Sequence, residues 1–212
     1  MEPVSGAPED EGGTADVLLG PRGAATRSRI LEAAAVCVRR WGIRRLSMND
    51  VARQAGVSRR TVYMYFPDRD TLVEAVLEAM AAALVLSITP DVRRHATLAA
   101  QVAEAAVRVH ALLPAEAELG LGRRPGESVS AAMILVRCPR VVRTWLAFWR
   151  PLVEAARDRG EIRADIDADT AAEWIMRLHI SLVTFPAQTF DAEDPEQVRR
   201  HVEAFVPGGF AS

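Results

Sequence analysis

Guanidinium, phenol and hydroxyl side chains gather between residues 47 and 69, in the segment SMNDVARQAGVSRRTVYMYFPDR. Such groups donate hydrogen bonds to phosphate oxygens and to the polar edges of bases. The side chains predicted to face outward from this segment are Arg59, Arg60, Thr61, Tyr63, Met64 and Tyr65. Their chemistry suits contacts to the groove of a nucleic acid and to its phosphates.

Two short helices joined by a glycine turn must position these side chains. Ser47, followed three residues later by Asp50, forms a capping box, so a helix is expected to begin at Ser47. Gly56 ends it, because glycine adopts the left-handed backbone of a sharp turn without steric cost. Ser58 caps a second helix that is predicted to run to about Phe66. The pattern predicts a helix-turn-helix element, and an ordinary pair of packed helices with solvated arginines is the alternative.

The distribution of charge favours the first interpretation. Residues 27–70 contain ten Arg and four Asp or Glu, a local net charge of +6, whereas the whole chain has a net charge of −2. Basic charge concentrated on one part of a chain is typical of a nucleic-acid interface. We therefore expect double-stranded DNA as a partner.

From about residue 27 to residue 75, the sequence resembles the tetracycline-repressor-like (TetR) family of bacterial regulators. The resemblance is carried by Ile30-Leu31-Glu32-Ala33-Ala34, Gly42, Ser47, Val51-Ala52, Ala55-Gly56-Val57-Ser58, Thr61-Val62-Tyr63, Tyr65-Phe66-Pro67 and Leu72. Two positions depart from the family pattern: Val38 stands where the family usually has Phe, and Arg69 where a Lys usually contacts a phosphate. Valine remains apolar, and arginine is a cation with a planar fork suited to phosphate.

The resemblance implies a role for each contact residue. Arg59, Thr61 and Met64 are expected to approach base edges. Phosphate contacts are expected from a second group of residues: Ser47, Arg60, Tyr63, Tyr65 and Arg69. Ser58 belongs to the site as the cap of the second helix. The family also implies a homodimer on a palindromic operator and a small-molecule effector enclosed by a helical body.

The whole chain is predicted to be all-α, with a disordered acidic arm over 1–23, a DNA-binding head over 24–70 and a helical effector-binding and dimerisation body over 71–212. Apolar residues recur at helical spacing, and no strand pattern emerges. Further helices are expected over 26–41, 69–86, 92–113, 128–137, 139–159, 169–185 and 195–206, with breaks at 87–91 and 114–127. The helix over 69–86 joins head and body and is expected to couple them.

Several other classes of protein find no support in the sequence. Cys37 and Cys138 lack metal-binding or redox spacing, which is typical of a reduced cytoplasm. The longest apolar run, Ala79 to Ile88, is shorter than a transmembrane helix requires, so no membrane partner is expected. The four histidines lie on separate segments, without a nucleophile elbow or a phosphate-binding glycine loop. We expect a cytoplasmic protein that is not an enzyme and has no metal or cofactor.

Aromatic and polarisable side chains in the body are candidates for an effector cavity: His110, Met133, Trp145, Phe148, Trp149, Met176 and His179. Because polar groups are few among them, an apolar or aromatic effector is expected. Plain core packing is the alternative for the aromatic residues. For His179, the alternative is a satisfied core or interface histidine.

The helix predicted over 169–185 has apolar residues on two sides, so it needs two packing partners. One partner is the body itself, and the other is expected to be a second copy of the chain. The predicted dimer interface consists of Trp174, Leu178, Ser181, Leu182, Phe185, Val202 and Phe205.

These patterns together predict a ligand-responsive repressor that acts as a homodimer. Two alternatives remain open: a helical small-molecule-binding protein or enzyme that retains a regulator-like hairpin, and a DNA-binding protein without a ligand. Binding to the chain's own upstream DNA would distinguish a regulator from the first alternative. A ligand in the body would distinguish a ligand-responsive repressor from the second.

Overall fold

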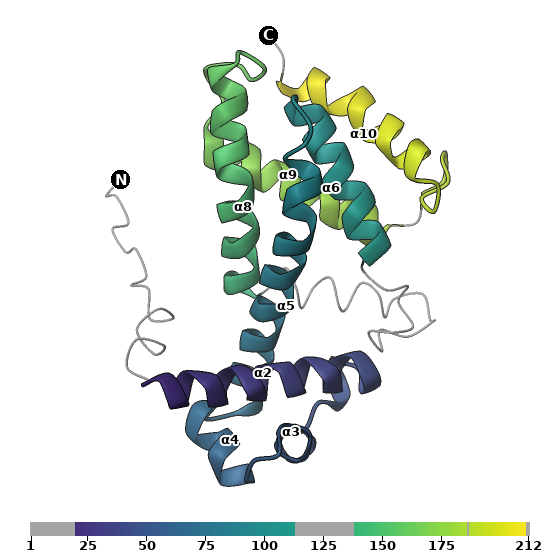
Figure 1. The fold of residues 1–212 in the computed structure, drawn as a ribbon. Coiled ribbons are helices and arrows are strands. Elements are labelled where there is room, and N and C mark those ends of the chain that lie inside the picture. Colours follow the sequence, from purple (N-terminus) through teal and green to yellow (C-terminus); the bar gives the residue numbers. More distant parts are fainter. Residues whose placement is uncertain (1–19, 113–137, 186, 211–212) are drawn as a thin grey trace, which may run out of the picture.

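The computed structural model describes residues 20–112, 138–185 and 187–210 as helices with short connections (Figure 1). The α-helices are α2 (Pro21–Trp41), α3 (Met48–Ala55), α4 (Arg59–Tyr65), α5 (Arg69–Val92), α6 (Leu98–Leu112), α8 (Pro139–Asp158), α9 (Ala168–Thr184) and α10 (Pro195–Phe210), and a 3-10 helix η1 spans Ile43–Arg45. These ranges contain no strand, in agreement with the predicted all-α class. Most of the expected arm, the break over 114–127, the helix over 128–137 and Met133 lie outside the described residues.

The head is formed by α2, α3 and α4, with α2 lying across the two shorter helices (Figure 1). Its apolar residues face inward and form a cluster with the first half of α5, which we call the head core: Ile30, Ala33, Ala34, Cys37, Val38, Ile43, Leu46, Met48, Val51, Ala52, Ala55, Val62, Phe66, Leu72, Ala75, Val76, Leu77, Ala81, Cys138 and Val141. Val38, which replaces the usual Phe, is buried among them.

The body packs around a second cluster, the body core: Ile88, Val92, Leu98, Val102, Ala103, Ala105, Ala106, Val109, Phe148, Trp149, Val153, Ala156, Ile162, Ala168, Ala171, Ala172, Ile175, Val198, Val202 and Val206. Helix α5 runs from the head into the body (Figure 1). There α8 packs on α5 and α9, and α10 packs on α6. The body core therefore draws residues from five helices that lie far apart in the sequence.

Helix α8 takes part in both cores. Cys138, just before its first turn, and Val141 lie in the head core, whereas Phe148 and Trp149, about two turns later, lie in the body core. Trp145 packs against both clusters. Head and body are consequently connected by two helices, α5 and α8, where the sequence pattern predicts only α5.

Helix α2 begins at Pro21, earlier than the predicted start at Thr26. Pro21 occupies the first helical position, where its missing N–H costs nothing and its fixed φ suits the helix. The expected acidic arm therefore ends before residue 21, and residues 21–23 belong to the head.

Helix α5 continues to Val92, so the predicted break at 87–91 is wrong. Pro90 lies inside the helix on an exposed position, whereas Ile88 and Val92 are fully buried in the body core. The Ser87 and Thr89 hydroxyls donate to the carbonyls of Leu84 and Val85, at 2.7 and 2.6 Å. Burial of the two apolar side chains outweighs the helix-breaking preference of a single proline.

Helix α6 begins at Leu98 instead of the predicted Val92, after a turn in which His95 N–H donates to the Val92 carbonyl. Thr97 precedes it and accepts a hydrogen bond from the Ala100 N–H at 3.3 Å, which is the pattern of an N-cap. Helices α8, α9 and α10 begin within one residue of their predicted starts, and α10 extends further, to Phe210.

Of the described helices, α5 is long and apolar enough to cross a membrane by length and composition alone. The core helix of a globular protein passes the same test. Because α5 packs on α2, α6 and α8, it acts here as the helix that links the two cores.

Candidate nucleic-acid interface and buried aromatic cluster

The start of α3 shows the predicted Ser47 cap with a different hydrogen-bond arrangement. The Ser47 hydroxyl accepts from the Asp50 N–H at 3.1 Å and donates its proton to the Asp50 carboxylate at 2.6 Å. Asp50 also forms an ion pair with Arg53, one turn later. The single hydroxyl proton of Ser47 is therefore committed within the head, which leaves none for a phosphate in this arrangement.

The turn between α3 and α4 has the geometry that the sequence predicts. Gly56 has φ 62° and ψ 36°, in the left-handed region, and Val57 N–H donates to the Ala52 carbonyl at 3.0 Å. Ser58 then caps α4 by accepting from the Thr61 N–H at 3.0 Å. The Ser58 and Thr61 hydroxyls lie 2.8 Å apart.

Helix α4 buries one side and exposes the other. Val62 lies in the head core and Phe66 follows the last turn into it, whereas Met64 is 72% exposed. Arg59 and Arg60 are also exposed at the start of the helix. The exposed side therefore offers cationic donors and an apolar thioether close together, which suits contacts to phosphates and to base edges.

The exposed Arg59 and Tyr63 form a pair one helical turn apart. The Arg59 guanidinium donates to the Tyr63 phenol oxygen at 3.2 Å and lies 5.3 Å from the centroid of its ring. Tyr65, in contrast, is half-buried and packs against the head core. Thr61 is also half-buried.

The guanidinium of Arg69 bonds to the head, although its side chain remains partly exposed beside Asp70. It donates to the backbone carbonyls of Ile43 at 2.6 Å and Leu46 at 3.0 Å, with a longer contact to Arg44 at 3.4 Å. These carbonyls belong to η1 and to the residue that follows it, just before α3 begins. The side chain predicted to contact a phosphate thus joins the first residue of α5 to the entry of α3.

Two exposed arginines, Arg44 and Arg45, flank this contact on η1. The sequence pattern counts them in the basic charge of the head but assigns them no contact. They lie on η1, which is too short to show a periodic pattern in the sequence. The sequence alone therefore gave no signal that these two arginines would be exposed beside the interface.

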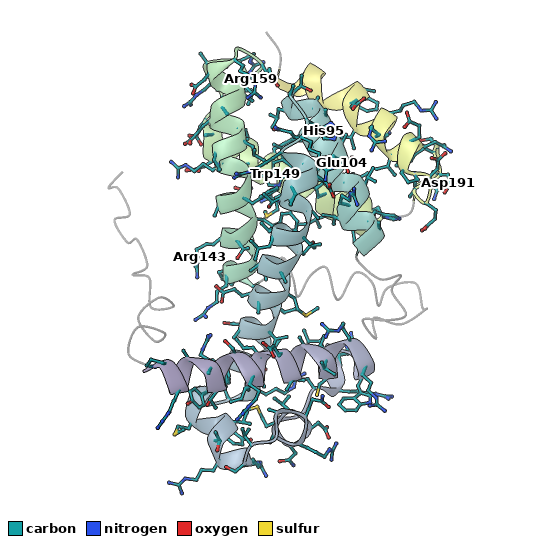
Figure 2. All side chains as sticks on the ribbon, viewed as in Figure 1. His95, Glu104, Arg143, Trp149, Arg159 and Asp191 are labelled. Atoms are coloured by element: carbon teal, nitrogen blue, oxygen red, sulfur yellow. The ribbon has the colours of Figure 1, made fainter. Side chains whose placement is uncertain are left out.

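In the body, Trp145, Phe148 and Trp149 lie on one side of α8 with edge-to-face ring contacts. The centroid distances are 6.1 Å between Trp145 and Phe148, and 4.9 Å between Phe148 and Trp149. Trp149 lies in the interior, whereas Arg143 points outward from α8 (Figure 2). The predicted aromatic group is thus brought together, with Trp145 only partly buried.

His179 of α9 stacks on Trp149, with centroids 5.3 Å apart and an interplanar angle of 21°. Its Nε2 lies 3.0 Å from the Val102 carbonyl of α6. Burial lowers the pKa of His179 to about 4, although the hydrogen bond to Val102 acts in the opposite direction. The imidazole is therefore neutral at pH 7.

The other predicted ligand residues are distributed differently. Met176 is buried on α9. His110 lies on α6 with its Nε2 3.3 Å from the Glu193 carboxylate, in the segment before α10, so it contacts a carboxylate near the surface. The structure therefore centres the candidate site on Trp149 and His179.

A buried ionic network lies between α6 and α10. Glu104 accepts from Arg108 at 2.9 Å and from Arg199 at 2.8 Å (Figure 2 labels Glu104). Burial by itself would raise the pKa of Glu104, but the hydrogen bonds from the two arginines lower it. This network holds α10 against α6 and was not predicted, because its members are separated by up to 95 residues in sequence.

The predicted dimer interface divides into two groups. Trp174 and Ser181 lie on exposed positions of α9, Phe185 directly after α9 is also exposed, and Phe205 of α10 is 67% exposed. Leu178 and Leu182 are partly buried against the body core. Val202 is 1% exposed and belongs to the body core, so we withdraw it from the interface: α10 turns this side toward α6.

Comparison with known proteins agrees with this geometry. The model of the bacterial regulatory proteins of the tetR family matches residues 30–76, which comprise most of the head and the start of α5. The crystal structure of the TetR family repressor AlkX from a Dietzia strain has the same fold, with a TM-score of 0.58 at 21% identity over 86% of this chain and 94% of that chain. The head of the chain is thus similar to the DNA-binding region of the tetR family.

Two further proteins are similar to the chain. An uncharacterized HTH-type transcriptional regulator of Mycobacterium bovis is 37% identical over 84 residues, 40% of this chain and 44% of the relative. The chain thus matches less than half of the length of that relative. The FadR regulator of Bacillus subtilis, solved in complex with stearoyl-CoA, shares the fold with a TM-score of 0.60 at 17% identity, over 84% of this chain and 98% of that chain.

The described residues contain no group of three or more His, Cys, Asp or Glu that could hold a metal ion. Cys37 and Cys138 are both buried as free thiols. Burial raises the pKa of the Cys37 thiol, with a further contribution from Asp50. In this part of the chain, the buried polar chemistry is concentrated in the body, around α6, α8 and α9.

Proposed function

We propose that the chain is a DNA-binding transcriptional regulator that acts as a homodimeric, ligand-responsive repressor. The observation that carries the proposal is the capped α3–α4 elbow, which buries Val62 and presents Arg59, Arg60 and Met64 on one exposed side. A helix in that position, preceded by a glycine turn, is the recognition helix of a helix-turn-helix.

In this proposal, Arg59, Thr61 and Met64 contact base edges. Arg60, Tyr63 and Tyr65 contact phosphates. Ser47 and Arg69 receive a different role, because their side chains already bond within the head, and Ser58 keeps its expected role as a cap. Ser47 and Ser58 set the starts of the two helices. Arg69 positions the entry of α3 relative to α5.

A homodimer is supported by the exposed apolar side chains of Trp174 on α9, Phe185 directly after it, and Phe205 on α10. Large apolar side chains on neighbouring elements of a surface are typical of a protein interface. Ser181 lies between Trp174 and Phe185 in the sequence, at helical spacing from both. Its small side chain would allow two helices to approach closely. Ser181→Trp should therefore give a folded monomer by light scattering, and a variant that remains dimeric would place the interface elsewhere.

Response to a ligand is supported by the route from body to head. Both α5 and α8 join the two cores, and the aromatic residues of α8 lie about one to three turns after Cys138 and Val141 in the head core. The complex of FadR with stearoyl-CoA supports a small molecule as the effector of this fold. A ligand that prefers a displaced α8 would then also favour a displaced head.

The test is a gel shift with the full chain on its own upstream DNA, against random DNA of the same length. Specific binding is expected. Tyr63→Phe should weaken binding to both DNAs almost equally, because a phosphate contact carries no sequence information. Equal affinity of the wild type for the two DNAs would contradict the proposed function and favour a helical carrier that retains the hairpin.

A further inference from the structure

Three buried side-chain atoms of the described residues have no hydrogen-bond partner: Gln101 Oε1 on α6 and two ring atoms, Trp149 Nε1 and His179 Nδ1. Trp149 is 0% exposed, and His179 is likewise buried. A buried polar group without a partner costs about 1–3 kcal/mol, so native structures rarely retain one without a reason. Here the two occur on rings that stack on each other, with centroids 5.3 Å apart.

The hydrogen-bonding character of each atom follows from its surroundings. The indole Nε1 of Trp149 is only a donor. A backbone carbonyl is only an acceptor, so His179 Nε2, 3.0 Å from the Val102 carbonyl, carries the proton of the neutral imidazole. His179 Nδ1 is therefore an acceptor. The two stacked rings therefore carry one unpaired donor, Trp149 Nε1, and one unpaired acceptor, His179 Nδ1.

A hydroxyl group matches this pair, because it donates one hydrogen bond and accepts another. A carboxylate accepts only, and it would bring a negative charge into the core. The buried polar side chains of the described residues are Gln101, Glu104 and His179, and Glu104 is already neutralised by Arg108 and Arg199. An anionic ligand would find no uncommitted cation among these side chains.

The site is closed in this structure, since both nitrogens are inaccessible to solvent. A ligand can therefore enter only when α8 and α9 move apart, and it then stabilises the open arrangement by satisfying both atoms. Because Cys138 and Val141, at the other end of α8, lie in the head core, the same movement reaches the DNA-binding head.

We propose that the effector is an uncharged, largely apolar molecule with a hydroxyl group, which donates to His179 Nδ1 and accepts from Trp149 Nε1. This inference rests on the proposed ligand-responsive function and narrows it from any apolar molecule to neutral alcohols or phenols.

The test uses two probe series that keep the apolar frame and change only the polar group: naphthalene, 2-naphthol and 2-naphthoate, and octane, 1-octanol and octanoate. Each is titrated into the full-length protein by calorimetry at pH 7.5. In at least one series, the alcohol should bind about tenfold more tightly than both the hydrocarbon and the carboxylate, which corresponds to one well-formed buried hydrogen bond. Equal binding of alcohol and hydrocarbon, tightest binding of the carboxylate, or no binding in either series would overturn the proposal.

Trp149→Phe removes the N–H and keeps an aromatic ring, so the preference for the alcohol should fall below about threefold while the hydrocarbon still binds. Trp145→Phe is the matched control, since it makes the same change on the same helix at a partly buried ring. Loss of the preference in the control as well would overturn the assignment to Trp149. If Trp149→Phe does not fold, the comparison of the three probes with the wild type decides by itself.

The same probes are added to the gel shift on upstream DNA. An alcohol that binds with the expected preference but does not release DNA would leave the ligand assignment in place and contradict ligand-controlled repression. Release of DNA by the hydrocarbon and the alcohol at equal concentrations would overturn the ligand assignment and leave the proposed function in place.

Discussion

Head and body satisfy their polar groups over different sequence distances. In the head, Ser47, Ser58 and Asp68 each accept from a backbone N–H three residues later, and Arg59 bonds to Tyr63 four residues later. In the body, Glu104 bonds to Arg199 across 95 residues and His179 to Val102 across 77. Local contacts are set by spacing in the chain, whereas distant ones depend on how whole helices pack. The helix caps of the head are therefore specified by its own short segment, whereas these two contacts of the body depend on its assembly.

The two regions nevertheless share a helix, and the largest expected effect tests whether they unfold together. Phe66 is 1% exposed in the head core, so Phe66→Ala should lower the free energy of unfolding by about 3–5 kcal/mol. Because α8 contributes Cys138 and Val141 to that core, thermal unfolding should remain a single transition by circular dichroism and tryptophan fluorescence. Two separated transitions would show that the head is independent of the body.

The next effect belongs to the body alone and depends on pH. The pKa of His179 is lowered from its ordinary 6.5 to about 4, so the unfolded chain binds the proton between these values and the folded chain does not. Stability should therefore fall as the pH drops from 6.5 to about 4, by about 3 kcal/mol from this residue. His179→Gln should remove that part of the decrease in denaturant titrations across this range.

His110→Gln provides the control for His179, because His110 is partly exposed beside Glu193. The decrease in stability that is assigned to His179 should remain in this variant. If His179→Gln leaves the profile unchanged, the imidazole is not held neutral in the folded state.

The third prediction concerns the contact between α5 and the head. Arg69→Ala leaves the carbonyls of Ile43 and Leu46 without their charged donor, which should cost about 1–3 kcal/mol of stability. The slope of log affinity for DNA against log salt should stay the same, since no phosphate contact is lost. Arg60→Ala, at an exposed position of α4, is the matched comparison and should reduce that slope by about 0.9. A reduced slope for Arg69→Ala would restore it as a phosphate contact.

The smallest effect on stability is expected at Met64, which is 72% exposed. Met64→Ala should leave the melting temperature almost unchanged, because little of the side chain is removed from water. It should instead change the preferred base at one operator position, since a thioether contacts a thymine methyl and not a polar edge. Selection from randomised operator DNA checks this, and identical selected sites for both proteins would exclude the contact.

This comparison also explains what could be predicted from the sequence. Ser47, Gly56 and Ser58 specify caps and a turn by local rules, so the elbow and its exposed side follow from spacing alone. The extension of α5 past Pro90 could not be predicted, because it depends on burial of Ile88 and Val92 against helices that lie later in the chain. The same holds for Val202, whose apolar character does not say which neighbouring surface covers it.

The candidate site shows the same division. Trp149 and His179 stand out as aromatic and titratable residues in the sequence, but only the packing of α8, α9 and α6 reveals that each has one nitrogen without a partner. Arg69 also shows this division. Its positive charge matches the family pattern, whereas the direction of its side chain depends on the carbonyls of Leu46 and Ile43, 23 and 26 residues earlier.

The placement of Cys138 and Val141 in the head core has a consequence for exchanging operator specificity between related regulators. A chimera cut after α4 or within α5 would join a transplanted head to the first turn of a foreign α8, whose side chains were selected against a different set of neighbours. Exchange of residues 21–81 together with 138–141 keeps the complementary surfaces intact. The unit that can be transplanted is therefore discontinuous in the sequence, although the helix-turn-helix itself occupies one short segment.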